Sequence, residues 1–344
     1  MTNVLVVDDS AVVRQAFSQL LGRQVAIETA PDALIAEQKI RRHRPDVVVL
    51  DLQMPQMDGL TFLRRIMTAD PLPVVICSAG AARGSETAMR ALHEGAVDII
   101  LKPQLGVQEF LRESAVVVAD TLRAASQARV VRRLARAANN DDARAIVRKS
   151  IQPRPQSTQR IIAAGASTGG TEALREIIEA LPEDAPPMVV VQHMPAGFTT
   201  AFARRLDSLA RVSVKEAEAG DELLRGRVLI APGDRHMIVL RHGFGYRMHL
   251  GAGPLVSRHR PSVDVLFRSV AQSAGANAIG VLLTGMGDDG ADGMAELHEA
   301  GSRTIAQDEA TSVVFGMPKE AVARGAVDEI LPLASIAARI RELS

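Results

Sequence analysis

Short, unbroken apolar runs recur along the chain, and each is followed by a longer segment with helical periodicity. Such runs occupy residues 4–7, 47–50 (directly after Asp46) and 74–77 in the first part, with a further run at 97–101 that Asp98 interrupts, and residues 161–164, 188–191 and 278–283 in the second. Unbroken apolar runs of this length are typical of strands buried in parallel sheets. A weaker strand pattern lies near residues 25–28. The alternation predicts two α/β units, each a doubly wound and mostly parallel sheet.

The pattern changes between residues 123 and 158. Basic residues are frequent there: Arg129, Arg132, Arg133, Arg136, Arg144, Arg148, Lys149 and Arg154. The segment ends in a polar, proline-bearing stretch at 152–158 and has no aromatic residue that could stack on a nucleic-acid base. We interpret it as a solvated, flexible linker. The predicted organisation is residues 1–122, a linker at 123–158, and residues 159–344.

Composition excludes several function classes. The 344 residues carry 40 basic and 40 acidic side chains, so no overall field attracts nucleic acid. The single cysteine, Cys77, excludes an intramolecular disulfide, fits a reducing cytoplasm, and is expected to be a buried thiol. We find no signal-peptide pattern and no apolar run of bilayer length, so a cytoplasmic protein without membrane insertion is expected.

Polar residues stand at the strand ends of the first unit: Asp8, Asp9, Asp51, Ser78 and Lys102. The carboxyl ends of parallel strands meet at one sheet edge, so these side chains should converge. Three carboxylates repel one another, and a hard divalent cation, Mg²⁺ above all, relieves that repulsion. The cation and Lys102 could then neutralise a phosphoryl group carried by Asp51. A single aspartate could simply cap a helix, but the full set favours an acidic pocket.

Residues 1–122 resemble a response-regulator receiver domain. The resemblance lies in VLVVDDS (4–10), VVVLDLQMPQMDGL (47–60), the serine that ends the 74–77 strand, and the Lys-Pro pair at 102–103. It implies a flavodoxin-like, five-stranded parallel sheet and phosphorylation by a partner histidine kinase. Ile99 stands where receivers usually carry an aromatic residue that changes rotamer on activation.

The same resemblance implies roles for single residues. Asp51 would accept the phosphoryl group, and Ser78 and Lys102 would contact its oxygens. Mg²⁺ would be bound by Asp9, Asp51 and the backbone carbonyl of Gln53, with Asp8 assisting through water.

The stretch RIIAAGASTGG (160–170) places a serine where a strand passes into a helix. Gly-x-Ser-x-Gly is the nucleophile-elbow pattern, in which small neighbours let the backbone bend and expose the serine hydroxyl. The N–H groups of the following helix favour developing negative charge. Ser167 is therefore a candidate nucleophile, although a glycine-rich turn could instead bind a phosphate or cap a helix.

Partners for Ser167 follow two other apolar runs. His193 comes directly after the 188–192 segment, and Asp288 and Asp289 follow the 278–283 run. All three strands should end at the same sheet edge, so a Ser-His-Asp triad is possible. Its order along the chain differs from that of the α/β-hydrolases, which the geometry of a triad allows. Spacing alone leaves Asp288 and Asp289 as alternatives.

Residues 159–344 resemble the catalytic domain of the chemotaxis protein-glutamate methylesterase family. The shared pieces are GASTGG (165–170), VVQHMP (190–195), APGDRHM (231–237), HRPSVDVLF (259–267), LTGMGDDGADGM (283–294) and VVFGMPKEA (313–321). The resemblance implies the triad Ser167, His193 and Asp289, because the family commonly has Asn-Asp at 288–289. It also implies an oxyanion site formed by the backbone N–H groups of Met286 and Thr168.

The implied activity is phosphorylation-activated hydrolysis of glutamate methyl esters, and deamidation of glutamines, on methyl-accepting chemoreceptors. A chemosensory histidine kinase would donate the phosphoryl group, and the esterase site would need no cofactor. A non-catalytic DNA- or nucleotide-binding output domain is the alternative; the sequence has neither a helix-turn-helix pattern nor Gly-Lys-Ser/Thr. The histidines at 236, 242, 249 and 259 lack zinc-site spacing, His259 is expected near the site, and a hairpin is expected near 241–250.

Overall fold

The computed structural model describes residues 2–22, 24–79, 82–102, 108–130 and 160–344. They fall into two compact units, residues 1–136 and 137–344. The last helix of the first unit continues to Ser126. Most of the predicted linker lies outside the described residues, so its boundaries stay a prediction.

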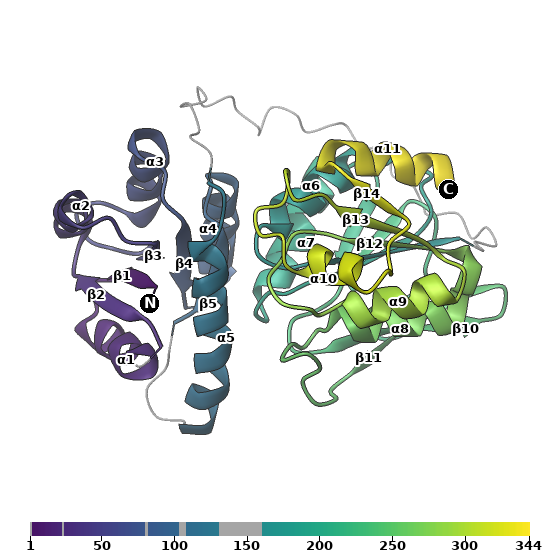
Figure 1. Cartoon of the computed structure of the whole chain (residues 1–344), viewed down its shortest axis with the longest axis horizontal. Coiled ribbons are helices and arrows are strands. Elements are labelled where there is room, and N and C mark those ends of the chain that lie inside the picture. The colour runs from purple at the N-terminus through teal and green to yellow at the C-terminus, as the bar shows by residue number, and fades with distance from the viewer. Residues whose placement is uncertain (1, 23, 80–81, 103–107, 131–159) are drawn as a thin grey trace. The chain divides into compact units, whose positions relative to one another are not determined.

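The first unit alternates strands and helices (Figure 1). Its elements are β1 (Asn3–Val7), α1 (Ala11–Leu21), β2 (Ala26–Ala30), α2 (Ala33–Arg42), β3 (Val47–Asp51), α3 (Gly59–Ala69), β4 (Val74–Ser78), α4 (Ala82–His93), β5 (Asp98–Leu101) and α5 (Gln108–Ser126). The strand order is β2-β1-β3-β4-β5, and every pair is parallel. This is the flavodoxin-like order, so the predicted five-stranded fold is confirmed.

Local chemistry explains where these elements begin. Strands β3 and β4 are buried along their whole length, as unbroken apolar runs require. Ser10, Asp32 and Asp58 cap α1, α2 and α3, because each side chain accepts a hydrogen bond from a backbone N–H of the first turn. The β1–α1 and β3–α3 turns follow parallel neighbouring strands and so lie at the same carboxyl edge of the sheet. Cys77 is buried in β4, as expected of a structural thiol.

The second unit is larger and contains a seven-stranded sheet. Its elements are β6 (Ile161–Ala166), α6 (Gly170–Ala180), β7 (Met188–Gln192), α7 (Phe198–Leu209), β8 (Ser213–Glu216), β9 (Arg227–Ile230), β10 (His236–His242), β11 (Gly245–Gly251), α8 (Val263–Ala274), a 3₁₀ turn (Gly275–Asn277), β12 (Ala278–Leu282), α9 (Ala291–Glu299), β13 (Arg303–Gln307), α10 (Met317–Ala323), β14 (Glu329–Leu331) and α11 (Leu333–Leu343). The order β14-β13-β12-β6-β7-β9-β8 is parallel at every pair, which confirms the predicted class.

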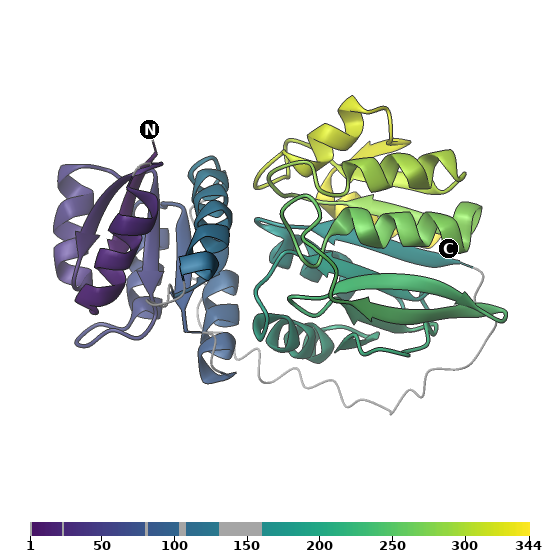
Figure 2. The ribbon, with the colours of Figure 1, turned by 90° about the horizontal axis from the view of Figure 1, so that it is seen from below.

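Helices cover both faces of this sheet. Helices α6 and α11 pack together on one face, and α8 and α9 pack together on the other (Figure 1). The antiparallel hairpin β10–β11 packs beside α8 (Figure 2) and is longer than the hairpin expected from the sequence. At the centre, β6 lies between β12 and β7. The three strands that lead into the candidate triad are therefore neighbours.

Candidate active site and acidic pocket

Ser167 lies in the turn between β6 and α6. Gly169 has a φ of 79°, a left-handed conformation that glycine adopts without strain, and this lets the chain turn directly into the helix. The Ser167 N–H donates to the Thr284 carbonyl at 3.0 Å, and its own carbonyl accepts from Gly170 N–H at 2.7 Å. The backbone of Ser167 is thus fixed. Its side chain is half-buried, and its hydroxyl forms no hydrogen bond with any of the described residues.

A second backbone segment lies directly against Ser167. A Cβ added to Gly285 would lie 2.7 Å from the Ser167 Cβ, so only glycine permits this close approach. The Gly285 N–H donates to Val314 and its carbonyl accepts from Met317, which fixes the segment. The next residue, Met286, thus directly follows a backbone segment that is fixed against the serine turn.

His193 is the residue after β7, and the register of the sheet places it next to Ser167. Ala166 of β6 pairs with Gln192 of β7, and His193 N–H donates to the Ala166 carbonyl at 3.1 Å. Adjacent strands are about 4.8 Å apart. Ser167 directly follows Ala166 and His193 directly follows its partner Gln192, so Ser167 and His193 lie side by side at the carboxyl edge.

The imidazole of His193 meets a carboxylate at one nitrogen only. Its Nε2 lies 2.7 Å from Asp289 Oδ2, while its Nδ1 is buried and has no hydrogen-bond partner in the described part of the chain. Asp288, the other candidate, is exposed, with its carboxylate 3.9 Å from the Arg324 guanidinium. Of the two aspartates, the geometry brings Asp289 to the histidine.

The N-terminus of α8 surrounds Asp289 with donors. Oδ1 accepts from the Ser262 hydroxyl at 2.7 Å and from Asp264 N–H at 3.0 Å, and Oδ2 accepts from Val263 N–H at 2.8 Å. Burial alone would raise the pKa of Asp289, but the hydrogen bonds from His193 and from these donors outweigh it and hold the pKa well below its usual range. Asp289 is therefore an anion, so Nε2 of His193 carries the proton and Nδ1 is left as a base.

Sequence reasoning missed two polar residues of this region. The Gln192 amide donates to the carbonyls of Ser167 and His193, at 2.9 and 3.1 Å, and so ties the two turns together. Ser262 caps α8 and also donates to Asp289. Each left a signal: a glutamine ending an otherwise apolar strand, and a serine directly before an apolar periodic segment. His259, expected near the site, stacks on the His193 ring.

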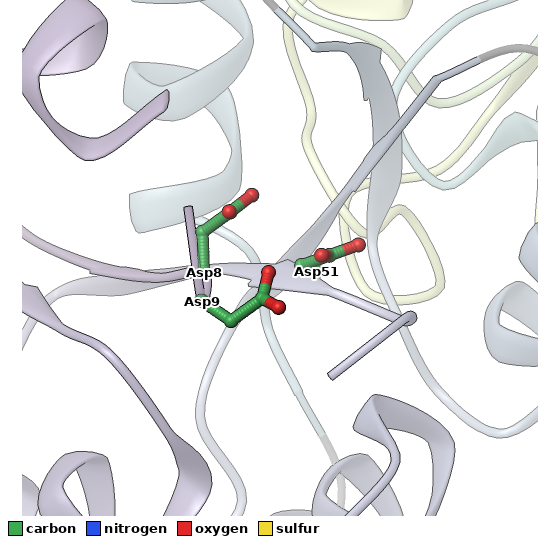
Figure 3. A group of neighbouring side chains, drawn as sticks. All are labelled: Asp8, Asp9 and Asp51. Atoms are coloured by element: carbon green, nitrogen blue, oxygen red, sulfur yellow. The ribbon is translucent and has the colours of Figure 1, made fainter. Parts of the chain in front are cut away.

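The first unit holds the predicted acidic pocket. One carboxylate oxygen from each of Asp8, Asp9 and Asp51 lies within 4.8 Å of the others (Figure 3). Lys102 Nζ donates to Asp51 Oδ2 at 2.7 Å and forms an ion pair with Asp8 Oδ2 at 3.0 Å. The Gln53 N–H donates to Asp51 Oδ1 at 3.1 Å. These residues are therefore brought together at the carboxyl ends of β1, β3 and β5.

Burial and charge act in opposite directions in this pocket. Burial raises the pKa of Asp51, and the hydrogen bonds from Lys102 and Gln53 offset that rise only in part. Burial would lower the pKa of Lys102, but the neighbouring Asp51 and Asp8 carboxylates outweigh it and raise that pKa. The charged form of Lys102 is thus favoured in this pocket, whereas the charged form of Asp51 is disfavoured by its burial.

The remaining predicted residues lie on β4 and β5. Ser78 ends β4 and is buried, and its carbonyl accepts from Lys102 N–H at 2.9 Å. Ile99 is buried in β5, where it pairs with Ile76 of β4. An aliphatic side chain therefore occupies the position of the receiver aromatic residue.

Together, these observations define a class of protein: a receiver-like unit followed by an α/β unit that brings a serine, a histidine and an aspartate to one sheet edge. Residues 4–114 match the response regulator receiver domain family, and residues 162–340 match the family described as CheB methylesterase. The chain belongs to the CheB methylesterase family. The alternative of a DNA- or nucleotide-binding output domain is therefore wrong.

Similar proteins cover the chain from end to end. "Protein-glutamate methylesterase/protein-glutamine glutaminase 3" of Geobacter metallireducens is 53% identical over 99% of this chain and 98% of its own. The enzyme numbered 1 under the same name in Anaeromyxobacter dehalogenans is 56% identical over 98% of this chain and 97% of its own. The crystal structure of the Thermotoga maritima CheB methylesterase catalytic domain covers 54% of this chain and 98% of its own, with 42% identity and a TM-score of 0.53. Among the described residues, no helix has both the length and the apolar character needed to cross a bilayer.

Proposed function

We propose that the second unit hydrolyses glutamate γ-methyl esters and glutamine amides on methyl-accepting chemoreceptors, and that phosphorylation of the first unit raises its activity. Family membership and the names of the relatives supply the substrate class. The observation that carries the proposal is the hydrogen bond between His193 Nε2 and Asp289 Oδ2 beside the Ser167 turn. It leaves one basic nitrogen, Nδ1, for the serine proton.

In the proposed first half-reaction, Ser167 Oγ attacks the ester carbonyl carbon. His193 Nδ1 takes the hydroxyl proton, and Asp289 orients the ring and stabilises the resulting imidazolium. The proton then passes from Nδ1 to the methoxy oxygen as the C–O bond breaks. Methanol leaves, or ammonia in the case of an amide, and the glutamyl group stays on Ser167.

Backbone amides would stabilise the negative charge that develops on the carbonyl oxygen. Met286 is a candidate because the Gly285 backbone lies against Ser167, and Thr168 is a candidate because it follows the nucleophile. Loss of one such donor typically costs about 2.7–4 kcal/mol of transition-state stabilisation. In the second half-reaction, His193 takes a proton from water as the water oxygen bonds to the acyl carbon. The proton then passes from His193 to Ser167 Oγ as the acyl C–O bond breaks, which releases glutamate and restores the serine.

The acidic pocket of the first unit fits Mg²⁺ by its donor set. The site offers only oxygen atoms, which that cation prefers. Asp8 Oδ2 is buried and lies 3.0 Å from the Lys102 ammonium, its ion-pair partner, so it keeps lone pairs for a water bound to the cation. Asp9, Asp51 and the Gln53 carbonyl would bind the ion directly, with Asp8 acting through water. When bound, Mg²⁺ neutralises charge on the phosphoryl oxygens.

Asp51 would accept a phosphoryl group from the phosphohistidine of a chemosensory kinase. Lys102 already donates to Asp51 Oδ2 and would move to a phosphoryl oxygen. The hydroxyl of Ser78, at the end of the neighbouring strand β4, would donate to another phosphoryl oxygen. In the unmodified pocket Lys102 neutralises the Asp51 carboxylate; after phosphorylation the same ammonium would neutralise the phosphoryl group instead.

Substitution of the nucleophile tests the hydrolytic proposal. Ser167→Ala should abolish methanol release from a receptor fragment carrying γ-methyl-glutamate, because the neighbouring hydroxyl of the turn, that of Thr168, is buried and cannot replace it. Ser208→Ala is the matched control, since that hydroxyl lies on the exposed end of α7 and should be dispensable. Turnover retained in the Ser167→Ala protein would disprove the proposed mechanism.

A further inference from the structure

The triad leaves one close contact of His193 unexplained. The imidazole of His259 stacks on the His193 ring, with centroids 3.7 Å apart and planes inclined by 10°. His259 forms no ion pair or hydrogen bond through its ring within the described residues. A contact of this geometry restricts the motion of both rings.

A strained turn holds His259 in place. Val256 and His259 exchange both backbone hydrogen bonds, at 2.9 and 3.1 Å, across the two central residues Ser257 and Arg258. These have φ values of 49° and 68°, the signature of a type I′ turn, which non-glycine residues adopt only when their surroundings impose it. The turn therefore needs an external anchor.

Asp264 provides that anchor. Its Oδ2 accepts from the Ser257 hydroxyl at 3.1 Å, and its Oδ1 accepts from Gly290 N–H at 2.9 Å. Because Gly290 follows Asp289, one buried carboxylate on α8 joins the turn that carries His259 to the loop that carries the triad aspartate. The turn that positions His259 and the loop that positions His193 through Asp289 are thus held by the same residue, Asp264.

His193 needs such support because its ring is fixed at one end only. Nε2 is bound to Asp289, whereas Nδ1 has no partner in the described part of the chain. A ring held by a single hydrogen bond can still swing out of plane and carry Nδ1 away from Ser167. A flat neighbour at 3.7 Å blocks that swing on one side.

The charge of His259 suits this role. Burial and the charges of His193 and Arg258 lower its pKa to about 3, against a smaller opposing effect of Asp289. His259 is therefore neutral at neutral pH. When His193 gains the serine proton, its neighbour is an uncharged π face rather than a second cation, which would repel it.

We propose that His259 is a positioning residue for the hydrolysis proposed above, whose flat ring holds the His193 imidazole in the plane in which Nδ1 faces Ser167. This inference rests on the proposed esterase function. It makes His259 a support for the base, with no proton transfer of its own.

Three substitutions of His259 test whether His193 needs a flat ring beside it or only a side chain that fills the space. His259→Ala should lower kcat for methanol release from the methylated receptor fragment by about ten- to a hundred-fold, with KM changed less than two-fold, since misplacement of a catalytic group has this scale of effect. His259→Phe restores a flat ring and should recover kcat to within a few-fold of the unmodified protein. His259→Leu fills the space without a ring face and should stay impaired. The exposed histidine variant His242→Ala is the control and should be unaffected.

The rate at which a fluorophosphonate labels Ser167 should follow the same order, since that reaction uses the base without receptor docking. If His259→Ala does not fold, the Phe and Leu variants decide alone: equal rates in the two overturn the inference. The pH–rate profile of His259→Phe should superimpose on that of the unmodified protein, and a lost limb would instead make His259 a proton carrier. Normal kcat in His259→Ala with a dead Ser167→Ala overturns this inference only, whereas an active Ser167→Ala overturns the proposed function itself.

Discussion

Two buried aspartates, one in each unit, show how the same side chain acquires opposite properties. Asp51 ends β3 and Asp289 lies beyond the end of β12, so both stand at the carboxyl edge of a parallel sheet. Their exposures are nearly equal, at 2% and 1%. Yet the pKa of Asp51 is raised and that of Asp289 is lowered. Burial cannot explain the difference, because the two residues share it.

The number of donors explains it. Within the described residues, Asp289 accepts four hydrogen bonds: one from His193, one from the N-cap residue Ser262, and two from the first backbone N–H groups of α8, where the helix dipole adds further stabilisation. Asp51 accepts one backbone N–H and the Lys102 ammonium, and it lies beside two further carboxylates. A saturated carboxylate stays charged and unreactive, which suits the orientation of a histidine. A carboxylate with few donors keeps lone pairs for a cation or a phosphoryl group.

Removal of the charge at Asp289 should have the largest effect. In Asp289→Asn, the amide NH₂ would either face His193 and remove the acceptor of Nε2–H, or face the backbone donors of α8 and oppose them. In both orientations the negative charge that stabilises the His193 imidazolium is lost. By analogy with other triads, kcat should fall by roughly 10³–10⁴-fold. Steady-state methanol release from the methylated receptor fragment measures this loss.

Asp288→Asn is the matched control for that change. The Asp288 side chain is 55% exposed and its nearest cation, Arg324, is 3.9 Å away, so activity should stay within about two-fold of the unmodified protein. A greater loss of kcat in Asp288→Asn than in Asp289→Asn would show that the wrong aspartate has been assigned to the triad.

The corresponding substitution in the first unit, Asp51→Asn, should abolish stimulation by phosphorylation and leave the basal rate of ester hydrolysis unchanged. Asp51→Asn cannot form an acyl phosphate, so acetyl phosphate should no longer stimulate ester hydrolysis, while the basal rate stays the same. Comparison of initial rates with and without the phosphodonor measures the effect. Chelation of Mg²⁺ should abolish stimulation of the unmodified protein too; stimulation that survives either treatment would place the phosphoryl acceptor elsewhere.

The sequence predicted both folds because its apolar runs are short, unbroken and separated by helical segments. It also predicted the pocket and the serine turn, since these residues directly follow strands and so share an edge. The donors around Asp289 could not be predicted in this way. Ser262 and the amides of α8 lie some 25 residues from Asp289 and meet it only through tertiary packing.

The choice between Asp288 and Asp289 shows the same limit. Neighbouring residues in a loop point in different directions, and only the path of the loop decides which one is buried. The ring nitrogen that meets Asp289 and the stack of His259 on His193 also depend on side-chain rotamers, which periodicity does not encode.

Asp264 tests whether the number of donors sets the pKa of a buried carboxylate. It accepts more hydrogen bonds than Asp51 and fewer than Asp289. It accepts from Gly290 N–H, Gly293 N–H and the Ser257 hydroxyl, but burial and the adjacent Asp289 raise its pKa to about 6. The native state therefore binds this proton more tightly than the unfolded state, whose aspartates titrate near about 3.9. The resulting cost to stability is absent below about pH 4, builds as pH rises, and is complete above about pH 6.

Asp264→Asn removes that titration while its amide oxygen can still accept from the two glycines. Relative to the variant, the unmodified protein should lose up to about 3 kcal/mol of unfolding free energy between pH 4 and pH 7. Tyr246 is the only tyrosine and the chain has no tryptophan, so tyrosine fluorescence during urea unfolding reports on the second unit alone. The pKa of Asp289 is lowered in the folded protein, so its opposite contribution to stability changes mainly below about pH 4, outside this range. Parallel pH dependences in the two proteins would mean that the three donors suffice for Asp264, and that proximity to Asp289 adds no cost.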